Sequence, residues 1–434
     1  MNYRPIFHLL FLGVVSAMVG CASESAPPLE DIKVFSGATI IDGTGGNPIS
    51  DGVIVVREGR IEVVGSAGSV QIPEGAQTTD LSGKFVVPGL INAHGHVGET
   101  KGLESGPQHY SEQNVQDQLG LYARYGVTTV LSLGGDQQEG IQVRDSQSTP
   151  SLDRARLYVA GGIVTADTPE AARKEVDENA AMKVDFIKIR VDDNLGTSKK
   201  MTPEVYQAVI DQAHQHNIPL AAHFYYLEDG KALLRAGADL LAHSARDMEV
   251  DGEFMDLLKE KDVCLCPTLV REVSTFVYED IPEFFDDPFF QTDADPAVIE
   301  QLKEPERQAQ VRNSRAAQTY KKSLEMASVN LKKLVDGGVR IAFGTDSGPP
   351  ARFQGYFEHM ELDLMEKAGL SPMQILVSAT GEAARCVGLD TEVGTLEAGK
   401  WADFLVLSQD PLSGITHSKS LESVWISGNR VPGR

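Results

Sequence analysis

Eight near-continuous apolar runs, separated by stretches of helical period, constrain the fold of this chain more than any other feature. Between Phe85 and about Gly388 the runs are FVVPGLINAHGH, GVTTVLSLGG, RLYVAGGIVT, DFIKIRVDD, IPLAAHF, ADLLAHS, VCLCPTLV and VRIAFGTDSG. The stretches between them, such as 203–215 and 229–236, repeat apolar residues at steps of three and four. Strands that are apolar on both faces predict a parallel sheet covered by helices. Eight such units over about 300 residues predict an α/β fold, a closed (β/α)8 barrel of the TIM type.

The two segments that flank this region have a different texture. Residues 32–70 form short alternating runs closed by glycine, and the runs ADFLVLSQD and SVWISGNRV after Gly394 are similar, with no helical stretch between them. Because chain ends often lie close together, we expect the two segments to pair into one small composite β-sandwich. The predicted domains are the β-sandwich at 32–85 and 391–434 and the barrel at 86–390.

One connection inside the predicted barrel is longer than a single loop and helix. It spans 254–322 and carries an acidic, aromatic stretch at 278–290. Long connections in compact domains are usually functional. We therefore expect a rim insertion or a lid here.

Residues 1–20 predict a secretory signal peptide rather than part of the fold. Arg4 precedes an apolar run, and small residues follow it up to Cys21. The stretch 18–21 (MVGC) resembles a bacterial lipobox, whose cysteine becomes lipidated, although it lacks the leucine preferred three residues before that cysteine. We expect a lipidated tether at 21–31 and an exported protein of the bacterial cell envelope, in contact with the membrane through its lipid anchor alone. Plain secretion and an uncleaved anchor are the alternatives.

The charge of the chain excludes one class of partner. The sequence holds 62 acidic and 39 basic residues, for a formal net charge of −23. An acidic surface repels phosphate, so we expect no nucleic-acid partner. The charge does not identify a substrate, because the field inside a cleft can oppose the global sign. Homo-oligomerisation stays open.

The remaining cysteines are Cys264, Cys266 and Cys386. An odd number predicts no disulfide framework. Cys264 and Cys266 alternate along one apolar run, so both face one side of a strand, and we interpret them as small buried hydrophobes. One intervening residue is shorter than the usual two-to-four spacing of a zinc knuckle, which argues against a metal role for this pair.

Residues that can bind metal occur where the apolar runs end. They are His94 and His96 in the first run, Lys188 in the fourth, His223 in the fifth, His243 in the sixth and Asp346 in the eighth. Each has an ordinary structural explanation alone, such as a core histidine, a solvent-reaching lysine or a turn cap. In a barrel, however, the carboxyl ends of the strands meet at the active site. Burying so many polar groups without a metal is costly, so the set predicts a site for zinc or a similar divalent ion.

The order of these motifs resembles the amidohydrolase superfamily. PGLINAHGH, the lysine of the fourth run, AAH, LAHS and FGTDSG follow one another as they do there, and the resemblance extends to VFSGATIIDGTG, GRIEVVG and VGTLEAGKWADFLVL in the flanks. It covers about 34–431. The GVTTV and FIK segments are most similar to the imidazolonepropionase-like and Xaa-Pro dipeptidase (prolidase-type) branch.

The resemblance implies a role for each of the six side chains. It gives two zinc ions per chain, with His94, His96 and Asp346 on the buried ion, His223 and His243 on the second, and a carbamate on Lys188 as the bridge. A free ammonium beside two cations is repelled, whereas a carbamate is anionic. Related branches that lack the lysine hold one metal. A Schiff-base aldolase on the same barrel also uses a lysine, but it leaves the four histidines unexplained.

The mechanism that the resemblance implies uses water activated by the metal. Asp346 accepts its proton and passes it to the leaving amine. Tyr225 lies two residues beyond His223 and is an oxyanion donor if the strand continues, or else an aromatic residue of the rim. Arg190 and Arg271 are candidates for binding a substrate carboxylate, or else they pair with nearby acids. Weaker candidates are Gly135, Asp136 and Arg246.

We therefore expect a metal-dependent enzyme that hydrolyses a C–N bond in a small amide, a dipeptide-like molecule or a cyclic amide. An Xaa-Pro dipeptidase is one form of this activity. Two alternatives stay open: a mononuclear cyclic-amide hydrolase of the imidazolonepropionase type, and a non-catalytic zinc-binding lipoprotein. Fold alone does not choose among them.

Overall fold

The computed structural model describes residues 32–434. The predicted signal peptide, Cys21 and the tether lie outside the described residues. Among the helices at 32–434, none combines the length and apolar character needed to cross a bilayer.

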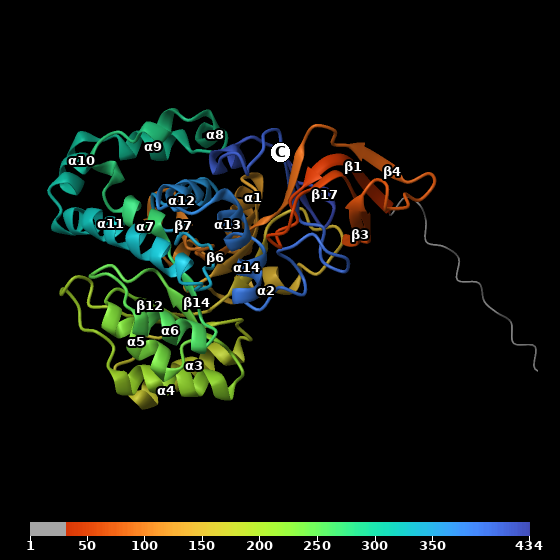
Figure 1. Cartoon of the computed structure of the whole chain (residues 1–434). Helices are drawn as coiled ribbons and strands as arrows, with labels where there is room; N and C mark the ends of the chain where they lie inside the picture. The colour runs from red at the N-terminus through yellow and green to blue at the C-terminus, as the bar shows by residue number, and fades with distance from the viewer. Residues whose placement is uncertain (1–31) are drawn as a thin grey trace, which may run out of the picture.

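Both flanking segments contribute to one eight-stranded sheet, in the order β17-β16-β15-β5-β1-β2-β3 with β4 paired to β1. Its strands are β1 (Ile32–Ile40), β2 (Ile49–Arg57), β3 (Arg60–Ser66), β4 (Gln77–Asp80), β5 (Phe85–Pro88), β15 (Phe404–Leu407), β16 (Leu421–Ile426) and β17 (Asn429–Arg430). β5 joins the two segments, because it pairs with β15 on one side and with β1 on the other. Figure 1 shows this sheet beside the helical part of the molecule.

Aromatic residues hold the two ends of the chain together within this sheet. The ring of Phe35 from β1 lies 4.8 Å from that of Phe404 in β15 and 4.6 Å from that of Trp425 in β16, both in edge-on contact. On β1 the neighbouring Val34 belongs to a separate buried cluster with Val53. The period of two therefore places successive side chains in different clusters, as expected for strands.

The middle of the chain alternates strands and helices. Its strands are β6 (Leu90–Gly95), β9 (Val127–Ser132), β10 (Arg156–Val159), β11 (Ile187–Val191), β12 (Leu220–Phe224), β13 (Leu240–Ala242) and β14 (Cys264–Cys266). Its helices are α1 (Glu112–Arg124), α2 (Gln138–Asp145), α3 (Pro169–Ala181), α4 (Pro203–Gln215), α5 (Leu227–Ala236), α6 (Gly252–Glu260), α11 (Arg315–Asp336), α12 (Tyr356–Lys367), α13 (Pro372–Ser378) and α14 (Gly381–Cys386). The strands form two parallel sheets, β10-β9-β6 and β11-β12-β13-β14.

Contacts at both ends join these two parallel sheets. The eighth predicted run is not an extended strand, but it lies where expected, between β14 and β6. Ile341 bridges Leu265 of β14, and the Phe343 carbonyl accepts a hydrogen bond from the Ala93 amide of β6. At the other end a bridge joins Val164 to Ile189 of β11. The predicted α/β arrangement of parallel strands alternating with helices is confirmed.

The first predicted run divides between two sheets. β5 belongs to the eight-stranded sheet and β6 to the parallel strands, with Gly89 between them. A Cβ at Gly89 would lie 2.0 Å from the Thr128 hydroxyl oxygen, so a side chain does not fit where the chain crosses. The series of parallel strands therefore begins a few residues later than the run suggests.

Helices of this region begin where the sequence supplies a capping side chain. Ser111, Thr168, Asp251 and Ser314 each accept a hydrogen bond from a backbone N–H in the first turn of α1, α3, α6 and α11. Such caps satisfy donors that have no partner inside the helix. They fix where each helix starts over the parallel strands.

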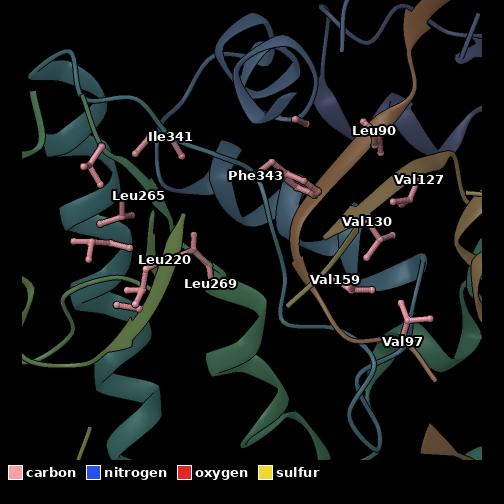
Figure 2. Packing of buried hydrophobic residues seen from close by; sticks show 14 of the residues in the cluster. Leu90, Val97, Val127, Val130, Val159, Leu220, Leu265, Leu269, Ile341 and Phe343 are labelled. Carbon is pink, nitrogen blue, oxygen red and sulfur yellow. The ribbon is translucent and has the colours of Figure 1, made fainter. Parts of the chain in front are cut away.

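Alternation along the parallel strands separates helix-facing side chains from inward-facing ones. Figure 2 shows part of the helix-facing cluster, including Leu220 and Leu265. Ala221 and Cys266, their neighbours on the same strands, belong to a smaller inner cluster. Because side chains alternate along a strand, Lys188 on β11 faces inward, opposite to its helix-facing neighbour Ile187.

The long connection is a rim of short helices, as predicted. After β14 come α7 (Leu269–Ser274), α8 (Pro288–Gln291), α9 (Pro296–Leu302) and α10 (Pro305–Arg312), with 3₁₀ turns at Val277–Glu279 and Glu283–Asp286. Figure 1 shows α8 to α10 as an arc along one edge of the molecule. Its aromatic residues pack inward, where Phe290 lies 5.0 Å from Tyr356 of α12 between ring centroids. Whether this rim closes as a lid stays a prediction.

Smaller elements complete the fold. They are β7 (Thr100–Lys101), β8 (Glu104–Ser105) and 3₁₀ turns at Pro107–His109 and Ile415–Lys419. β7 and β8 form a separate antiparallel pair after the first parallel strand.

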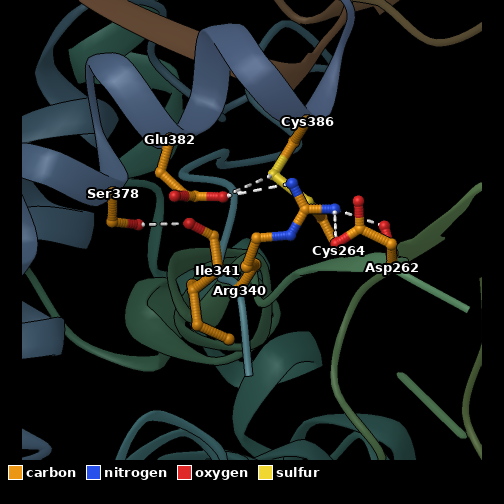
Figure 3. The surroundings of a disulfide bond; sticks show 7 residues. All are labelled: Asp262, Cys264, Arg340, Ile341, Ser378, Glu382 and Cys386. Atoms are coloured by element: carbon orange, nitrogen blue, oxygen red, sulfur yellow. Dashed lines mark hydrogen bonds and ion pairs between the residues drawn. A yellow bond between two sulfur atoms is a disulfide. The ribbon is translucent and has the colours of Figure 1, made fainter. Parts of the chain in front are cut away.

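The prediction that the cysteines form no disulfide is wrong. Cys264, at the start of β14, is bonded to Cys386, at the end of α14, across 122 residues of sequence (Figure 3). Cys266 is buried and free, which agrees with its interpretation as a small hydrophobe. Counting cysteines could not reveal this bond, because the pairing depends on the end of α14 packing against the start of β14.

Candidate functional site

The side chains predicted from the strand ends come together in the structure. Lys188 of β11 places its Nζ 3.2 Å from Nε2 of His94 on β6. The ring of His243 lies between those of His94 and His223, with centroid distances of 4.7 and 4.3 Å. Residues from four separate parts of the chain therefore share one buried site.

Asp346 completes the group from the eighth run. Its Oδ1 lies 2.9 Å from Nε2 of His96 and 3.7 Å from Nε2 of His94. Its other oxygen, Oδ2, accepts a hydrogen bond of 2.6 Å from Arg352. The carboxylate is thus held between the two histidines of the first run and a guanidinium that the sequence did not single out.

The histidines are oriented by partners behind them. Asp192 Oδ2 lies 2.8 Å from Nε2 of His223, and the Thr268 hydroxyl lies 2.6 Å from Nδ1 of His243. The Gly134 carbonyl is 3.2 Å from Nδ1 of His96. Partners of this kind fix the ring orientation and tautomer of metal-binding histidines.

This donor set fits a divalent cation. Ligand atoms of His94, His243 and Asp346 all lie within 4.8 Å of one another. In the described part of the chain, the buried Nδ1 of His94 has no hydrogen-bond partner. Imidazole and carboxylate are ligands that zinc and similar ions take. His94, His243 and Asp346 therefore form a group that a divalent ion would satisfy.

The protonation states also suit metal binding. Burial lowers the pKa of His223 to about 3 and holds the pKa values of His94 and His243 well below the ordinary range. These imidazoles are therefore neutral near pH 7, as ligands must be. Burial likewise lowers the pKa of Lys188 to about 8. Burial acts to raise the pKa of Asp346, but the guanidinium of Arg352 and the nearby histidines outweigh it and hold this pKa well below its usual value.

Three residues at the site have left-handed backbone conformations. The φ angles are 75° at His243, 58° at Asp346 and 49° at Thr268. This region is unfavourable for residues other than glycine, and such strain persists only when the surroundings enforce it. The turns that carry His243 and Asp346 are therefore held by their neighbours.

Tyr225 does not lie on a continued strand. β12 ends at Phe224, so the condition for placing Tyr225 on the face of His223 is not met. Its hydroxyl oxygen lies 2.8 Å from the Ser323 hydroxyl of α11. The Arg246 guanidinium stacks on its ring at 4.9 Å from the centroid.

The two predicted carboxylate-binding arginines lie in different surroundings. The Arg190 side chain is 46% exposed, 3.6 Å from Asp192, and borders a pocket with Lys199. Arg271 is buried on α7, where it donates to Glu272 at 3.2 Å and stacks on Tyr320. The structure brings neither into direct contact with the histidine cluster.

The weaker candidates have structural partners. Asp136 accepts hydrogen bonds from the amides of Ala160 and Gly161, and burial raises its pKa to about 7. Gly135 borders a pocket that also includes His96. Arg246 is buried and donates to Glu272 at 2.6 Å.

Sequence reasoning missed the residues that support the site. Asp192 sits in the VDD ending of the fourth run and Thr268 follows Pro267 in the seventh, so both occupy strand ends, the one signal that could have found them. Arg352 lies beyond the eighth run with no pattern that marks it. These side chains orient the predicted metal ligands, and residues of these types are too common at strand ends and in turns to be recognised from the sequence alone.

Comparisons with known proteins agree with this geometry. A family model described as the amidohydrolase family matches residues 85–431. The crystal structure of a candidate prolidase from Bifidobacterium longum is similar, with 26% identity, a TM-score of 0.73 and coverage of 93% of this chain and 95% of that one.

Two further proteins extend the comparison. The crystal structure of a Xaa-Pro dipeptidase with methionine in its active site has 22% identity and a TM-score of 0.73, over 92% of this chain and 99% of that one. A 5-methylthioadenosine/S-adenosylhomocysteine deaminase of Symbiobacterium thermophilum is 23% identical over 87% of this chain and 85% of its own. The similarity therefore spans nearly the full length of each protein.

Proposed function

The chain belongs to the amidohydrolase family and is a hydrolytic enzyme, and we propose that it cleaves the C–N bond of a small dipeptide-like amide, of which the Xaa-Pro class is the first candidate. One observation carries this proposal: the two histidines of the first run, Lys188, His223, His243 and Asp346 meet in one buried site, with Lys188 reaching it from the second position of β11. The names of the prolidase and dipeptidase neighbours support the substrate class.

The proposal includes a closed (β/α)8 barrel at 86–390 and a composite β-sandwich at 32–85 and 391–434. Bridges at Ile341 and Val164 support closure, because they join the two parallel sheets at both ends. The pairing of β5 with β1 and β15 supports one domain built from both ends of the chain.

We propose two zinc ions per chain, with His94, His96 and Asp346 on one, His223 and His243 on the other, and a carbamate of Lys188 between them. A neutral lysine amine is needed to add to carbon dioxide, with loss of one proton, and the pKa of about 8 leaves part of Lys188 neutral at pH 7. Its burial against His94 favours this arrangement over the mononuclear, imidazolonepropionase-like alternative.

A divalent ion at this site supplies an activated water and a Lewis acid for the amide carbonyl. Asp346 is ionised near neutral pH, because Arg352 and the histidines hold its pKa low. It accepts the proton of the attacking water and returns it to the leaving nitrogen. Tyr225 stays a predicted oxyanion donor, and its hydroxyl oxygen lies 2.8 Å from that of Ser323.

Two arginines that share one acidic partner are candidates for binding a substrate carboxylate. Arg246 and Arg271 both donate to the single carboxylate of Glu272, so these three residues carry one net positive charge. Arg190 is the alternative, and its exposure leaves its guanidinium accessible. A dipeptide supplies the carboxylate that either arginine would bind.

We also propose export and lipidation at Cys21. Disulfides form in oxidising compartments, so the Cys264–Cys386 bond supports a location outside the cytoplasm. Cys21→Ser should release the protein from the membrane fraction and block processing, and an unchanged membrane fraction would count against the anchor.

The substrate is tested with purified, metal-loaded protein and a panel of Xaa-Pro dipeptides, N-acyl amino acids and lactams. We expect hydrolysis within the first two groups, and loss of it in Asp346→Asn with the metal content measured in parallel. Turnover of lactams alone favours the cyclic-amide alternative. A protein that binds its metals and turns over nothing in the panel overturns the proposed substrate class.

A further inference from the structure

A buried carboxylate on α12 collects hydrogen bonds from both sides of the site. Glu358 has 0% exposure. Its Oε1 accepts from Nδ2 of Asn92 at 2.6 Å, from the Thr345 hydroxyl at 2.7 Å and from the Ser347 hydroxyl at 2.6 Å. Its Oε2 accepts from the Gly355 amide at 2.7 Å. Four donors therefore converge on this one carboxylate.

The donors to Glu358 come from the two segments that carry proposed ligands. Thr345 and Ser347 flank Asp346, whose φ of 58° needs enforcement. Asn92 lies on β6, and its Oδ1 accepts hydrogen bonds from the amides of His94 and Thr345, at 3.0 and 3.3 Å. Glu358 thus ties the strand of His94 to the turn of Asp346.

A second carboxylate, one turn further along α12, holds the opposite side of the site. Glu361 also has 0% exposure. Its two oxygens accept the backbone amides of Leu269 and Val270, at 2.8 and 2.6 Å. These are the first residues of α7, directly after Thr268, which contacts His243, and directly before Arg271.

Neither carboxylate is explained by a gain in stability. Burial raises the pKa of both carboxyls, for Glu361 to about 8. Within residues 32–434 their contacts are hydrogen bonds from neutral donors rather than ion pairs. Burying an acidic side chain without a cation is costly, because the group gives up either its hydration or its charge, and proteins keep such costs where function needs them.

We propose that α12 is a positioning helix with two separate tasks. Glu358 fixes Asp346 relative to His94, and so shapes the metal site and the proton-transfer geometry. Glu361 fixes the start of α7, and so places Arg271 for the substrate. Both are positioning residues, and the inference rests on the proposed function for its substrate half.

The test compares Glu358→Gln with Glu361→Gln in metal-loaded protein. A glutamine at 358 must turn its NH₂ toward a donor, such as the Gly355 amide, and its neutral oxygen binds the Thr345 and Ser347 hydroxyls more weakly than a carboxylate does, so the turn of Asp346 loosens. Losing a hydrogen-bond partner of a metal ligand typically lowers metal affinity or activity by about 10- to 100-fold. We expect metal affinity, measured by competition with a chelator, and kcat to fall about tenfold or more, while KM changes less than about twofold.

For Glu361→Gln we expect the opposite division. The amide can accept from one of the two backbone amides, so the start of α7 shifts and Arg271 moves with it. KM should rise about tenfold, while kcat and metal affinity stay within about twofold, because His243 keeps its own backbone hydrogen bond to Cys266. The metal-affinity measurement on Glu358→Gln needs no substrate, so that part of the test stands even if the proposed substrate class fails.

Asp403→Asn is the matched control, because Asp403 is a buried carboxylate that pairs with Arg156 at 2.8 Å, away from the proposed ligands. It should lower the melting temperature with kcat, KM and metal affinity unchanged. The proposal is overturned if both α12 variants behave like this control, or if each changes kcat and KM in equal proportion. Should Glu358→Gln fail to fold, Ser347→Ala removes one donor and must weaken metal affinity in the same direction.

Discussion

Two halves of the site differ in how the chain positions its side chains. His94, Lys188 and His223 lie within strands β6, β11 and β12. His243 comes directly after β13 and Asp346 lies at the end of the eighth run, and both have a positive φ. Within a strand, the pleat fixes the direction of each side chain. In the turns, direction depends on hydrogen bonds from distant residues. The orientation of the strand-borne half (His94, Lys188 and His223) is therefore set by the local backbone. The orientation of the turn-borne half (His243 and Asp346) depends on contacts that only the complete fold provides.

The largest effect should come from the turn-borne half. Asp346→Asn keeps the shape and some ligand capacity but cannot accept the proton of the attacking water. We expect kcat to fall at least about 10²-fold, with the protein folded and the His223–His243 metal retained, as steady-state kinetics and metal analysis will show. An Asn variant with near-normal kcat on a good substrate would sink this assignment even if every metal is in place.

The strand-borne counterpart is Lys188→Ala. Removing the bridge should lower the metal content from about two ions per chain toward one or none, and activity about 10- to 100-fold. Added short carboxylic acids should restore part of the activity by replacing the carbamate. Full occupancy and full activity in the alanine variant would remove Lys188 from the site.

The support of His243 gives an intermediate effect. Thr268→Val keeps the size and removes the hydroxyl that lies 2.6 Å from Nδ1 of His243. Metal affinity should fall about tenfold in a chelator titration, whereas Thr268→Ser should retain it. Equal affinities in the two variants would show that the turn holds His243 without this hydrogen bond.

The smallest effect on activity is expected at Asp136, a buried acid that borders the site. Its folded pKa of about 7 lies above its ordinary value of 3.8, so its contribution to stability is present below about pH 4 and is lost as the pH rises toward 7. Asp136→Asn should remove this dependence, worth about 1.4 kcal/mol for each pKa unit, with kcat nearly unchanged. Melting temperatures from pH 4 to 8 that are parallel in both proteins contradict the assignment.

The same division explains what the sequence could predict. The apolar runs and their ends located His94, Lys188 and His223, because a strand pattern carries direction with it. His243 and Asp346 were found by motif, but the hydrogen bonds of Thr268 and Glu358 that support their turns come from residues outside those motifs. No local pattern encodes such partners.

One error and one prediction that stays open have a similar origin. The cysteine count predicted no disulfide, because it gave no sign that α14 brings Cys386 to Cys264 at the start of β14. The spacing of Tyr225 assumed that β12 continues, whereas the strand stops at Phe224 and the chain turns toward α5. Both depend on where helices pack, which periodicity does not specify.

The eight-stranded sheet has a consequence for how the protein is made. β5 requires β15 as its partner, and the ring of Phe35 requires Trp425, so strands from the first hundred residues wait for the last strands to arrive. Loops of this length close slowly. In a chain emerging from the ribosome or from a translocon, β5 can pair with β1, but its other edge stays exposed until β15 is made. Until then that edge is free to associate with other chains.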